Sequence, residues 1–433
     1  MLDSELGKEV AMSIKKHSVT LDLSRCKGCT NCIKRCPTEA IRVHDGHAII
    51  KEDKCIDCGE CIRQCPYQAK KATYDSLDDY SSFKYKIALP APALFGQFED
   101  IEDLDEILTA LLYCGFDAVF EVSRAAELVT EYTRRYLKKE GITKPVISSA
   151  CPAIVRLIEL RFSYLSDNLL PILPPIEYAA RLARQEAKRD HPELNDEDIC
   201  VLFITPCPAK VSYIRNPLGL SKSAVNGALA MSDMYFKIRA KRKEVKEPLQ
   251  ISKTGIIGLN WAGTGGEANS LLSEKYLAAD GIENCIRVLD QIDNGTIHNL
   301  EFVELNACNG GCTGGTLNVE NPYIAKARLR SLRKYLPVSR NHTSDGGDNI
   351  PDDIFLEKSI LEEGVNITPS ERIDAIAKMA EAEDIYKNLP QIDCGSCGAP
   401  NCHALAEDIV NGEAKVGDCL IKLREILENK NID

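Results

Sequence analysis

The sequence contains no apolar run that approaches the roughly 20 residues needed to cross a bilayer. Its start, MLDSELGKEV, is acidic where a secretory signal would be basic. Positive charge is also scarce, since 53 Lys and Arg residues face 65 Asp and Glu residues and give a formal net charge of -12. A nucleic-acid backbone is bound by a basic surface, so this balance excludes nucleic acid as the main partner. We expect a cytoplasmic protein that does not associate with a membrane.

Cysteine, by contrast, is abundant, with 19 residues in a chain of 433. A secreted disulfide protein is usually short and does not group its cysteines in Cys-x-x-Cys runs. In a reducing compartment thiolates are free to bind metal. With 44% hydrophobic residues the chain can also bury a core. The composition therefore predicts a globular metal-binding protein that works in an anaerobic cytoplasm.

Two cysteine runs near the start share the spacing C-x2-C-x2-C-x3-C-P, which is typical of two-cluster ferredoxins. In such proteins the fourth cysteine of each run ligates the other cluster. The first [4Fe–4S] cluster is therefore expected on Cys26, Cys29, Cys32 and Cys65. The second is expected on Cys36, Cys55, Cys58 and Cys61. The competing interpretation, two zinc sites, would need Cys-x2-Cys pairs rather than quartets that end in proline.

A third quartet lies near the other end of the chain. It consists of Cys394, Cys397, Cys402 and Cys419, in the segment CGSCGAPNCHALAEDIVNGEAKVGDC. The pattern resembles the small four-cysteine [4Fe–4S] domain of several anaerobic redox proteins. Its glycines let backbone amides approach sulfur, which favours a reduced cluster. Zinc remains the alternative for an isolated quartet.

Between these ends, strand-like runs alternate with helical spacing from residue 85 onward. Helices are expected at Ile101 to Leu112 and Ala125 to Lys139. Strands are expected at Lys86 to Leu89, Ala118 to Glu121, Val146 to Ser149, Ile199 to Ile204, Gly255 to Leu259 and Phe302 to Leu305. This alternation predicts an α/β domain with parallel sheets.

Three of the expected strands lead directly into cysteine loops. Cys151 follows the third, Cys207 follows the fourth, and Cys308 and Cys312 follow the last. Ligands of open parallel sheets lie at the carboxyl ends of the strands. If all three loops leave one such edge, as we expect, their four cysteines could surround one cluster, although buried structural thiols remain the alternative.

These loops resemble the signature loops of [FeFe]-hydrogenases, and three flanking segments agree: APA at 91–93, GFDAVFEVSRAAEL at 115–128 and AGTGGE at 262–267. The resemblance implies that the four loop cysteines hold a [4Fe–4S] cluster. It also implies that Cys312 bridges to a two-iron subsite with CO, cyanide and a dithiolate amine. Lys210 would bond one cyanide. The other residues implied at the cofactor are Pro92, Ala93, Thr205, Pro206 and Asn306. Cys114, Cys200 and Cys285 match no motif.

The chain departs from that family where protons are delivered. Ala150 stands where efficient members have a relay cysteine, and a methyl group carries no proton. Tyr213 replaces a glutamate, and Thr133 stands at the place of another, so Glu127 or Glu131 would have to substitute. At the cofactor, Thr205 and Asn306 replace methionines and Ala93 replaces a serine. This combination resembles the sensory [FeFe]-hydrogenases that lack a PAS domain and carry a carboxy-terminal quartet.

The sequence thus predicts a multidomain α/β protein. Residues 1–82 would form a ferredoxin-like α+β domain, 83–340 a hydrogenase-type domain, 341–368 a linker and 369–433 a small helical Fe–S module. The expected function is slow H2 oxidation and proton reduction with a role in sensing. Expected partners are H2, protons, maturation proteins, and a redox partner such as ferredoxin or a signalling protein. The alternatives are a high-turnover hydrogenase and a non-catalytic electron-transfer or Fe–S assembly protein without the two-iron subsite.

Overall fold

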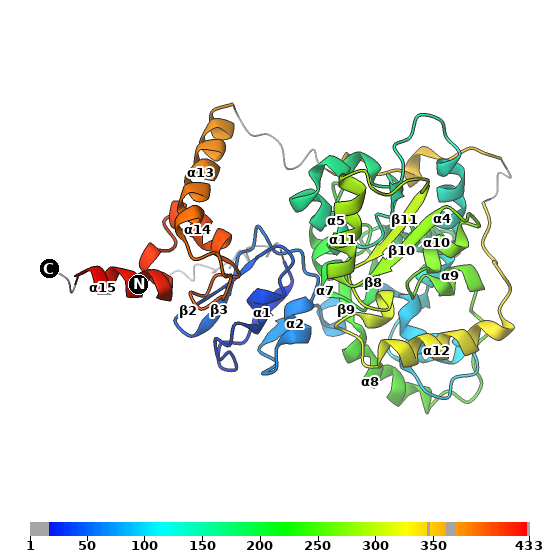
Figure 1. Ribbon diagram of the computed structural model, residues 1–433. Coiled ribbons are helices and arrows are strands. Elements are labelled where there is room, and N and C mark those ends of the chain that lie inside the picture. Colours follow the sequence, from blue (N-terminus) through cyan, green and yellow to red (C-terminus); the bar gives the residue numbers. More distant parts are fainter. Residues whose placement is uncertain (1–16, 344–346, 361–368, 431–433) are drawn as a thin grey trace, which may run out of the picture.

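The computed structural model describes residues 17–343, 347–360 and 369–430. A small amino-terminal domain, a large central α/β domain and a carboxy-terminal helical module follow one another along the chain (Figure 1). The predicted fold class, a mixed α/β chain with parallel sheets and a small helical end, is confirmed. In these residues no helix combines the length and apolarity that a membrane span requires.

The amino-terminal domain is built from two similar halves around the two cysteine runs. Each run leads into a short helix, α1 (Asn31–Lys34) or α2 (Glu60–Gln64). Strand β1 (Val19–Leu21) pairs antiparallel with β4 (Lys70–Ala72), and β2 (Ile41–His44) pairs antiparallel with β3 (His47–Ile50). Val19, Ile33 and Ile41 are almost fully buried, and together they form a core that holds the cysteine loops in place.

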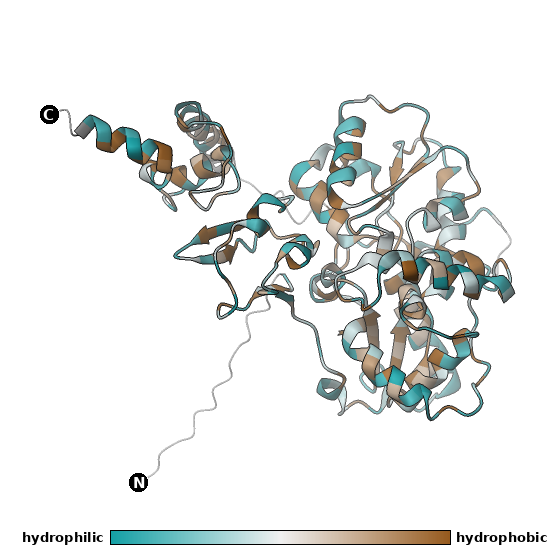
Figure 2. Ribbon diagram, turned by 60° about the horizontal axis from the view of Figure 1, so that its bottom comes forward, coloured by the Kyte–Doolittle hydropathy of each residue, from teal (hydrophilic) through white to brown (hydrophobic). Residues whose placement is uncertain are grey.

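The central domain contains two parallel sheets. One has the strand order β6-β5-β8-β9, with β5 at Tyr85–Pro90, β6 at Ala118–Val119, β8 at Ile199–Thr205 and β9 at Gly227–Ala230. The other has the order β10-β11-β7, with β7 at Val146–Ile147, β10 at Tyr276–Asp280 and β11 at Phe302–Asn306. Every residue of β8 is buried, as expected for an apolar run inside a parallel sheet. Hydrophobic residues gather on these strands (Figure 2).

Helices surround the two sheets. They are α3 (Leu104–Tyr113), α4 (Val122–Leu137), α5 (Pro152–Arg161), α6 (Pro175–Asp190), α7 (Pro208–Arg215), α8 (Met231–Arg242), α9 (Ile256–Asn260), α10 (Gly266–Ser270), α11 (Ile282–Asp293) and α12 (Pro322–Leu332). Helices α3, α6, α7 and α8 contact strands of the first sheet, and α10 and α11 contact strands of the second. Helices α5 and α7 begin at the proline that follows Cys151 or Cys207. Proline favours the first position of a helix, so each cysteine is fixed at a strand-to-helix turn.

The prediction of a strand at Gly255 to Leu259 is wrong, because this segment forms helix α9. Helix α9 packs against α4, and a Cβ at Gly258 would lie 2.1 Å from Ser123 O. The apolar run therefore reflects close helix packing rather than sheet formation. Strands β9 and β10 were not predicted, since their small residues, GALA and YLAAD, carry little β propensity.

The segment predicted as a linker is in part packed on the central domain. Ile354 is fully buried, and Phe355 forms an antiparallel bridge with Ile172. Leu356 N donates to Pro171 O at 3.0 Å, and Leu173 N donates to Ile354 O at 2.8 Å. Residues 344–346 and 361–368 of the predicted linker lie outside the described residues. The central domain thus extends beyond residue 340.

The carboxy-terminal module consists of α13 (Pro369–Asn388), α14 (Cys402–Val410) and α15 (Leu420–Lys430). It lies beside the amino-terminal domain, although the two are distant in sequence (Figure 1). Asp408 of α14 pairs with Arg42 and Lys51, and Val43 N donates to Gly398 O at 2.9 Å. This contact brings the last cysteine quartet next to the first domain.

Candidate functional site

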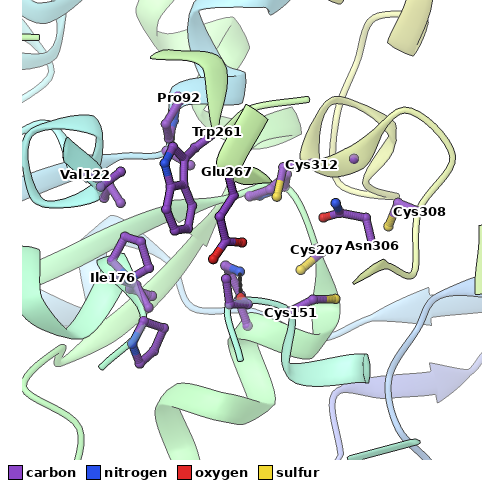
Figure 3. Close-up of a pocket in the computed structure, with 18 of the residues that line it drawn as sticks. Pro92, Val122, Cys151, Ile176, Cys207, Trp261, Glu267, Asn306, Cys308 and Cys312 are labelled. Carbon is purple, nitrogen blue, oxygen red and sulfur yellow. Dashed lines mark hydrogen bonds between the residues drawn. The ribbon is translucent and has the colours of Figure 1, made fainter. Parts of the chain in front are cut away.

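Cysteines from both parallel sheets line one cavity in the central domain. Cys151 follows β7, Cys207 follows β8, and Cys308 and Cys312 follow β11 (Figure 3). The sequence had suggested a single sheet edge, but β8 belongs to one sheet while β7 and β11 belong to the other. The cavity volume is about 80 Å³, which exceeds the space that one water needs.

Lys210 is the cation of this cavity. Its Nζ donates to Ala150 O at 2.9 Å, so the lysine of α7 is held beside the turn that precedes Cys151. Burial alone would lower the pKa of Lys210, but the negative charge of Cys312, Cys207 and the other two thiols raises it above its ordinary value. The lysine is therefore charged, and it lines the same cavity as the four cysteines.

The thiols themselves are costly to ionise without a cation. Burial raises the pKa of Cys207 to about 12 and that of Cys312 to about 11, although Lys210 opposes both shifts. One ammonium cannot balance four thiolates in a dry pocket. Iron would supply the missing positive charge, and four converging cysteines are the donor set of a [4Fe–4S] cluster. The residues present thus fit an iron–sulfur group.

The other residues expected at the cofactor divide into two groups. Pro92, Pro206 and Asn306 line the cavity. Ala93 and Thr205 are fully buried but do not line it. The Thr205 hydroxyl accepts from Cys207 N at 3.3 Å and donates to Cys207 O at 3.1 Å, so this threonine fixes the cysteine turn instead.

Glu267 is the cavity residue that the sequence analysis missed. It lies on α10, and Figure 3 shows its carboxyl group pointing into the cavity. Its Oε2 accepts from Ser148 Oγ at 2.6 Å, whereas the buried Oε1 has no hydrogen-bond partner among the described residues. Burial, followed by the charge of Glu304, raises the pKa of Glu267 to about 8. Glu267 therefore holds a proton at neutral pH.

Glu304, the second acid of the cavity, is held by donors. Its oxygens accept from Gly265 N and Ala268 N at 2.9 Å and from Asn306 Nδ2 at 2.8 Å. Burial raises its pKa, but these three bonds favour the charged form. Strand β11, FVELN, is apolar up to Asn306 except for Glu304. This single acid in a buried strand was the sequence signal that could have revealed the pair of Glu304 and Glu267.

The residues at the family's relay positions do not line the cavity, apart from Ala150. Within the described ranges the Tyr213 hydroxyl is buried without a hydrogen-bond partner, and Thr133 Oγ1 donates to Val129 O within α4. The acids considered as substitutes have other contacts. Glu127 accepts from the backbone of residues 255, 340 and 341, and Glu131 bonds Thr343 and pairs with Arg135.

The two ferredoxin-type quartets also surround separate cavities. One is lined by Cys26, Cys29, Cys32 and Cys65. The other is lined by Cys36, Cys55, Cys58 and Cys61. Each cavity thus combines the first three cysteines of one run with the fourth cysteine of the other run. Backbone amides point at sulfur in both, with Ala40 N donating to Cys36 Sγ and Ala69 N to Cys65 Sγ at 3.2 Å.

Arg63 of α2 connects the amino-terminal domain to the central cavity. Its Nη2 donates to Cys308 Sγ at 2.9 Å and to Gly314 O at 3.0 Å. Its Nη1 donates to Cys58 O at 3.4 Å. One guanidinium therefore touches a cysteine of the second ferredoxin-type quartet and a cysteine of the central quartet.

The last quartet lines a cavity in the carboxy-terminal module. Cys394 is exposed, whereas Cys402 and Cys419 are buried. A Cβ at Gly398 would lie 1.9 Å from Val43 O, and one at Gly395 would lie 3.4 Å from Lys34 Cε. Both glycines have positive φ and let this cysteine loop lie directly on the first domain. Of the ungrouped cysteines, Cys200 and Cys285 are buried in apolar clusters.

Three protein families match the chain. "Iron only hydrogenase large subunit, C-terminal domain" matches residues 84–247 and 265–316. "4Fe-4S dicluster domain" matches residues 18–66, and an Fe–S cluster family matches residues 389–421. All sixteen grouped cysteines lie within these ranges.

Curated relatives share only short segments. The chain is 41% identical over 49 residues to uncharacterized protein MJ0119 of Methanocaldococcus jannaschii, which is 11% of this chain and 22% of that protein. It is 43% identical over 53 residues to the acetyl-CoA decarbonylase/synthase complex subunit gamma of Methanopyrus kandleri, which is 11% and 12% respectively. The chain thus spans less than a quarter of the length of these relatives.

Among solved structures, an apo variant of the [FeFe]-hydrogenase HydA1 from Chlamydomonas reinhardtii is 15% identical, with a TM-score of 0.48, over 63% of this chain and 90% of that chain. HydA(deltaEFG), described as revealing stepwise H-cluster assembly, is 16% identical, with a TM-score of 0.45, over 64% and 88%.

Proposed function

Because the chain belongs to a hydrogenase-like family that carries additional Fe–S domains, we propose that it is a slow [FeFe]-hydrogenase-type protein with a role in sensing H2 or redox state. The observation that carries this proposal is the single buried cavity in which four cysteines, Lys210 and Glu267 meet. Structural thiols would not need a charged lysine among them.

In this proposal Cys151, Cys207, Cys308 and Cys312 hold a [4Fe–4S] cluster, and Cys312 also holds a two-iron subsite. When bound, that subsite supplies the heterolytic chemistry of H2. Lys210 orients an anionic ligand of the subsite through a charge-assisted hydrogen bond. Pro92, Pro206 and Asn306 shape the cavity around it. The twelve other grouped cysteines hold three further [4Fe–4S] clusters.

Electrons would pass from the central cluster to the other clusters in the order in which the cysteine quartets neighbour one another. Arg63 joins the central quartet to the second ferredoxin-type quartet, which adjoins the first in the same small domain. Gly395 and Gly398 then bring the carboxy-terminal quartet against the first domain. A redox partner such as ferredoxin, or a signalling protein, would exchange electrons at the exposed Cys394 end.

Proton handling falls to Glu267, since Ala150 cannot carry a proton. Its pKa of about 8 keeps a proton on the carboxyl group at neutral pH, and its unpartnered Oε1 borders the cavity. Ser148 Oγ holds the acid in place from the other side, and the neighbouring Glu304 disfavours its ionised form. A proton would therefore pass through one buried acid rather than through a relay of side chains, which accords with slow turnover.

The test combines metal analysis with a turnover assay on the matured full-length protein. We expect metal analysis to find four [4Fe–4S] clusters plus a two-iron subsite. We also expect slow but measurable H2 evolution from excess reductant. Zinc in the last quartet would remove that cluster from the proposal. Full cluster content without CO and cyanide would instead favour a non-catalytic electron-transfer or Fe–S assembly protein.

A further inference from the structure

A second cavity, of about 260 Å³, lies on the other side of the glycine-rich loop that leads to Glu267. Residues 262–264 and 266 of this loop line one part of it, and α12 and the short helix after it line another. No cysteine and no carboxylate is found among its described lining residues. The cavity is thus separate from the iron–sulfur sites in both place and chemistry.

Three cations enter this cavity: Lys326, Arg330 and Arg333. They follow one another at helical spacing, although the chain as a whole is acidic, with a net charge of -12. Within the described part of the chain, Lys326 and Arg330 have no carboxylate partner, and Arg333 Nη1 donates to the neutral Asn260 Oδ1 at 2.5 Å. Arg328 on the same helix, by contrast, pairs with Glu99 and Glu320 at 2.8 Å.

Two glycines of the loop leave room for the residues that surround this cavity. A Cβ at Gly263 would lie 3.0 Å from Lys326 Cε, and one at Gly266 would lie 1.8 Å from Asn260 O. Glycine therefore allows the lysine to lie across the loop. Asp280, an acid that contacts this loop, accepts from Thr264 Oγ1 at 2.7 Å and from Gly310 N at 2.8 Å, so two donors already offset its charge.

We propose that this cavity binds a small molecule that carries phosphate groups. Guanidinium groups bind phosphate oxygens through paired hydrogen bonds, and a lysine adds a point charge. The neutral amide donors of Asn260 and Asn269 would complete the recognition of oxygen atoms. Since Lys326 and Arg330 lack a carboxylate partner among the described residues, a neutral or cationic ligand would leave their charge unbalanced.

The same loop touches the iron–sulfur cavity on its inner side. Trp261 and Glu267 line that cavity, and Thr313 N donates to Ala262 O at 3.0 Å. A Cβ at Gly311 would lie 2.6 Å from Thr264 N, so the turn before Cys312 packs directly on the loop. A phosphate-bearing ligand would thus stabilise the loop that leads to Glu267. Its binding could then affect the iron–sulfur cavity from outside.

Equilibrium dialysis or calorimetry with the full-length cluster-loaded protein tests this site, with pyrophosphate, ATP and inorganic phosphate as probes. At about 0.15 M KCl, where exposed charges are screened, we expect at least one probe to bind with a Kd below about 1 mM. The double variant Lys326→Gln with Arg330→Gln should weaken binding at least about tenfold. Pyrophosphate and ATP binding alike would indicate recognition of the phosphates alone, and ATP binding alone would indicate a nucleotide.

The control is Lys334→Gln, which removes a neighbouring cation that lies over the Tyr335 ring and does not line the cavity. It should bind the probes as the native protein does, and all variants should keep their cluster content. The proposal is overturned if no probe binds at this salt concentration, or if the double variant binds as well as the control. Because binding is measured without any H2 assay, the result is independent of the proposed hydrogenase function.

Discussion

Glu267 Oε2 accepts a hydrogen bond from Ser148 Oγ at 2.6 Å, and this bond directs the free Oε1 of the acid toward the cysteine-lined cavity. Ser148 is the second residue before Ala150, the position at which the chain lacks a relay cysteine. The loop that carries Ala150 thus orients the acid from α10 that we propose as the proton carrier.

Replacing Glu267 by glutamine should lower H2 turnover by about 10²- to 10⁴-fold, because the amide keeps the shape and the Ser148 contact but transfers no proton. Cluster content should not change. In the native protein the rate of H2 evolution should fall as pH rises through about 8, where Glu267 loses its proton, and the variant should lack this inflection. Rates measured across pH with excess reductant check both points.

Glu131→Gln is the matched control for that variant, since Glu131 bonds Thr343 and Arg135 and does not line the cavity. Its rate should stay within about threefold of native. Equal losses in the two variants would show that Glu267 has no special part in proton transfer.

Introducing cysteine at Ala150 should raise turnover, most visibly when Glu267 is already glutamine. Ala150 lines the cavity, so a thiol there can carry a proton to it. The rate should remain below that of an efficient hydrogenase, because Tyr213 and Thr133 do not extend a proton path from residue 150. Among the described residues the Tyr213 hydroxyl has no partner, and the Thr133 hydroxyl bonds Val129 O of its own helix. Adding Tyr213→Glu should raise the rate further. No response in either variant, measured as H2 evolution, would contradict a severed relay.

The sequence could predict those residues of the site that stand at regular motif spacing. The cysteine groups follow regular motifs and strand ends, and the matches to three families confirm the family resemblance that they indicate. Glu267 and Glu304 could not be placed in this way, since they reach the cavity from α10 and from within β11. Their meeting depends on the packing of α10 against β11, which no local pattern encodes.

The same distinction holds for the fold. The strand β8 was predictable because a fully buried parallel strand is a continuous apolar run. The segment of α9 is also apolar, but its face is buried by contact with α4 through Gly258 and Ser123. A short apolar run does not distinguish these two kinds of burial. That the cysteine loops come from two sheets likewise follows only from long-range pairing.

Arg63→Gln should lower the reduction potential of the cluster held by Cys308, since a charge-assisted N–H···S bond stabilises the more negative reduced state. Loss of a bond of about 1.5 to 3 kcal/mol corresponds to roughly 60 to 130 mV for one electron. A redox titration monitored by electron paramagnetic resonance measures the shift. Arg25→Gln, which removes a cation of the same domain that bonds Gln68, should leave that potential unchanged. An unshifted potential in Arg63→Gln would exclude this role.

Asp408→Asn should release the carboxy-terminal module from the first domain. The side chains of Asp408 and Arg42 are both only 3% exposed, and removing one charge of a buried pair costs about 3 to 5 kcal/mol. Burial would raise the pKa of Asp408, but the hydrogen bonds from Arg42 and Lys51 lower it below its ordinary value. Docking should therefore be intact above about pH 4 and weaken as pH falls through the lowered pKa.

Limited proteolysis across pH measures this release as a shortened lifetime of the full-length chain. Glu413→Gln is the control, because Glu413 bonds the same Lys51 but is more than half exposed, and such a pair contributes at most about 1 kcal/mol. If Asp408→Asn resisted protease as well as Glu413→Gln at neutral pH, the buried pair would not be what holds the module.

The infrared spectrum of the matured protein, recorded with and without H2, tests the central claim most directly. We expect bands of CO and cyanide that shift when H2 is added, as a two-iron subsite that binds H2 would give. In Lys210→Ala these bands should weaken by about 10- to 100-fold while the [4Fe–4S] content stays unchanged, because the one ammonium that lies among the four cysteines is lost. Full maturation without any CO or cyanide band would contradict the hydrogenase-type function and leave an iron–sulfur protein without the two-iron subsite.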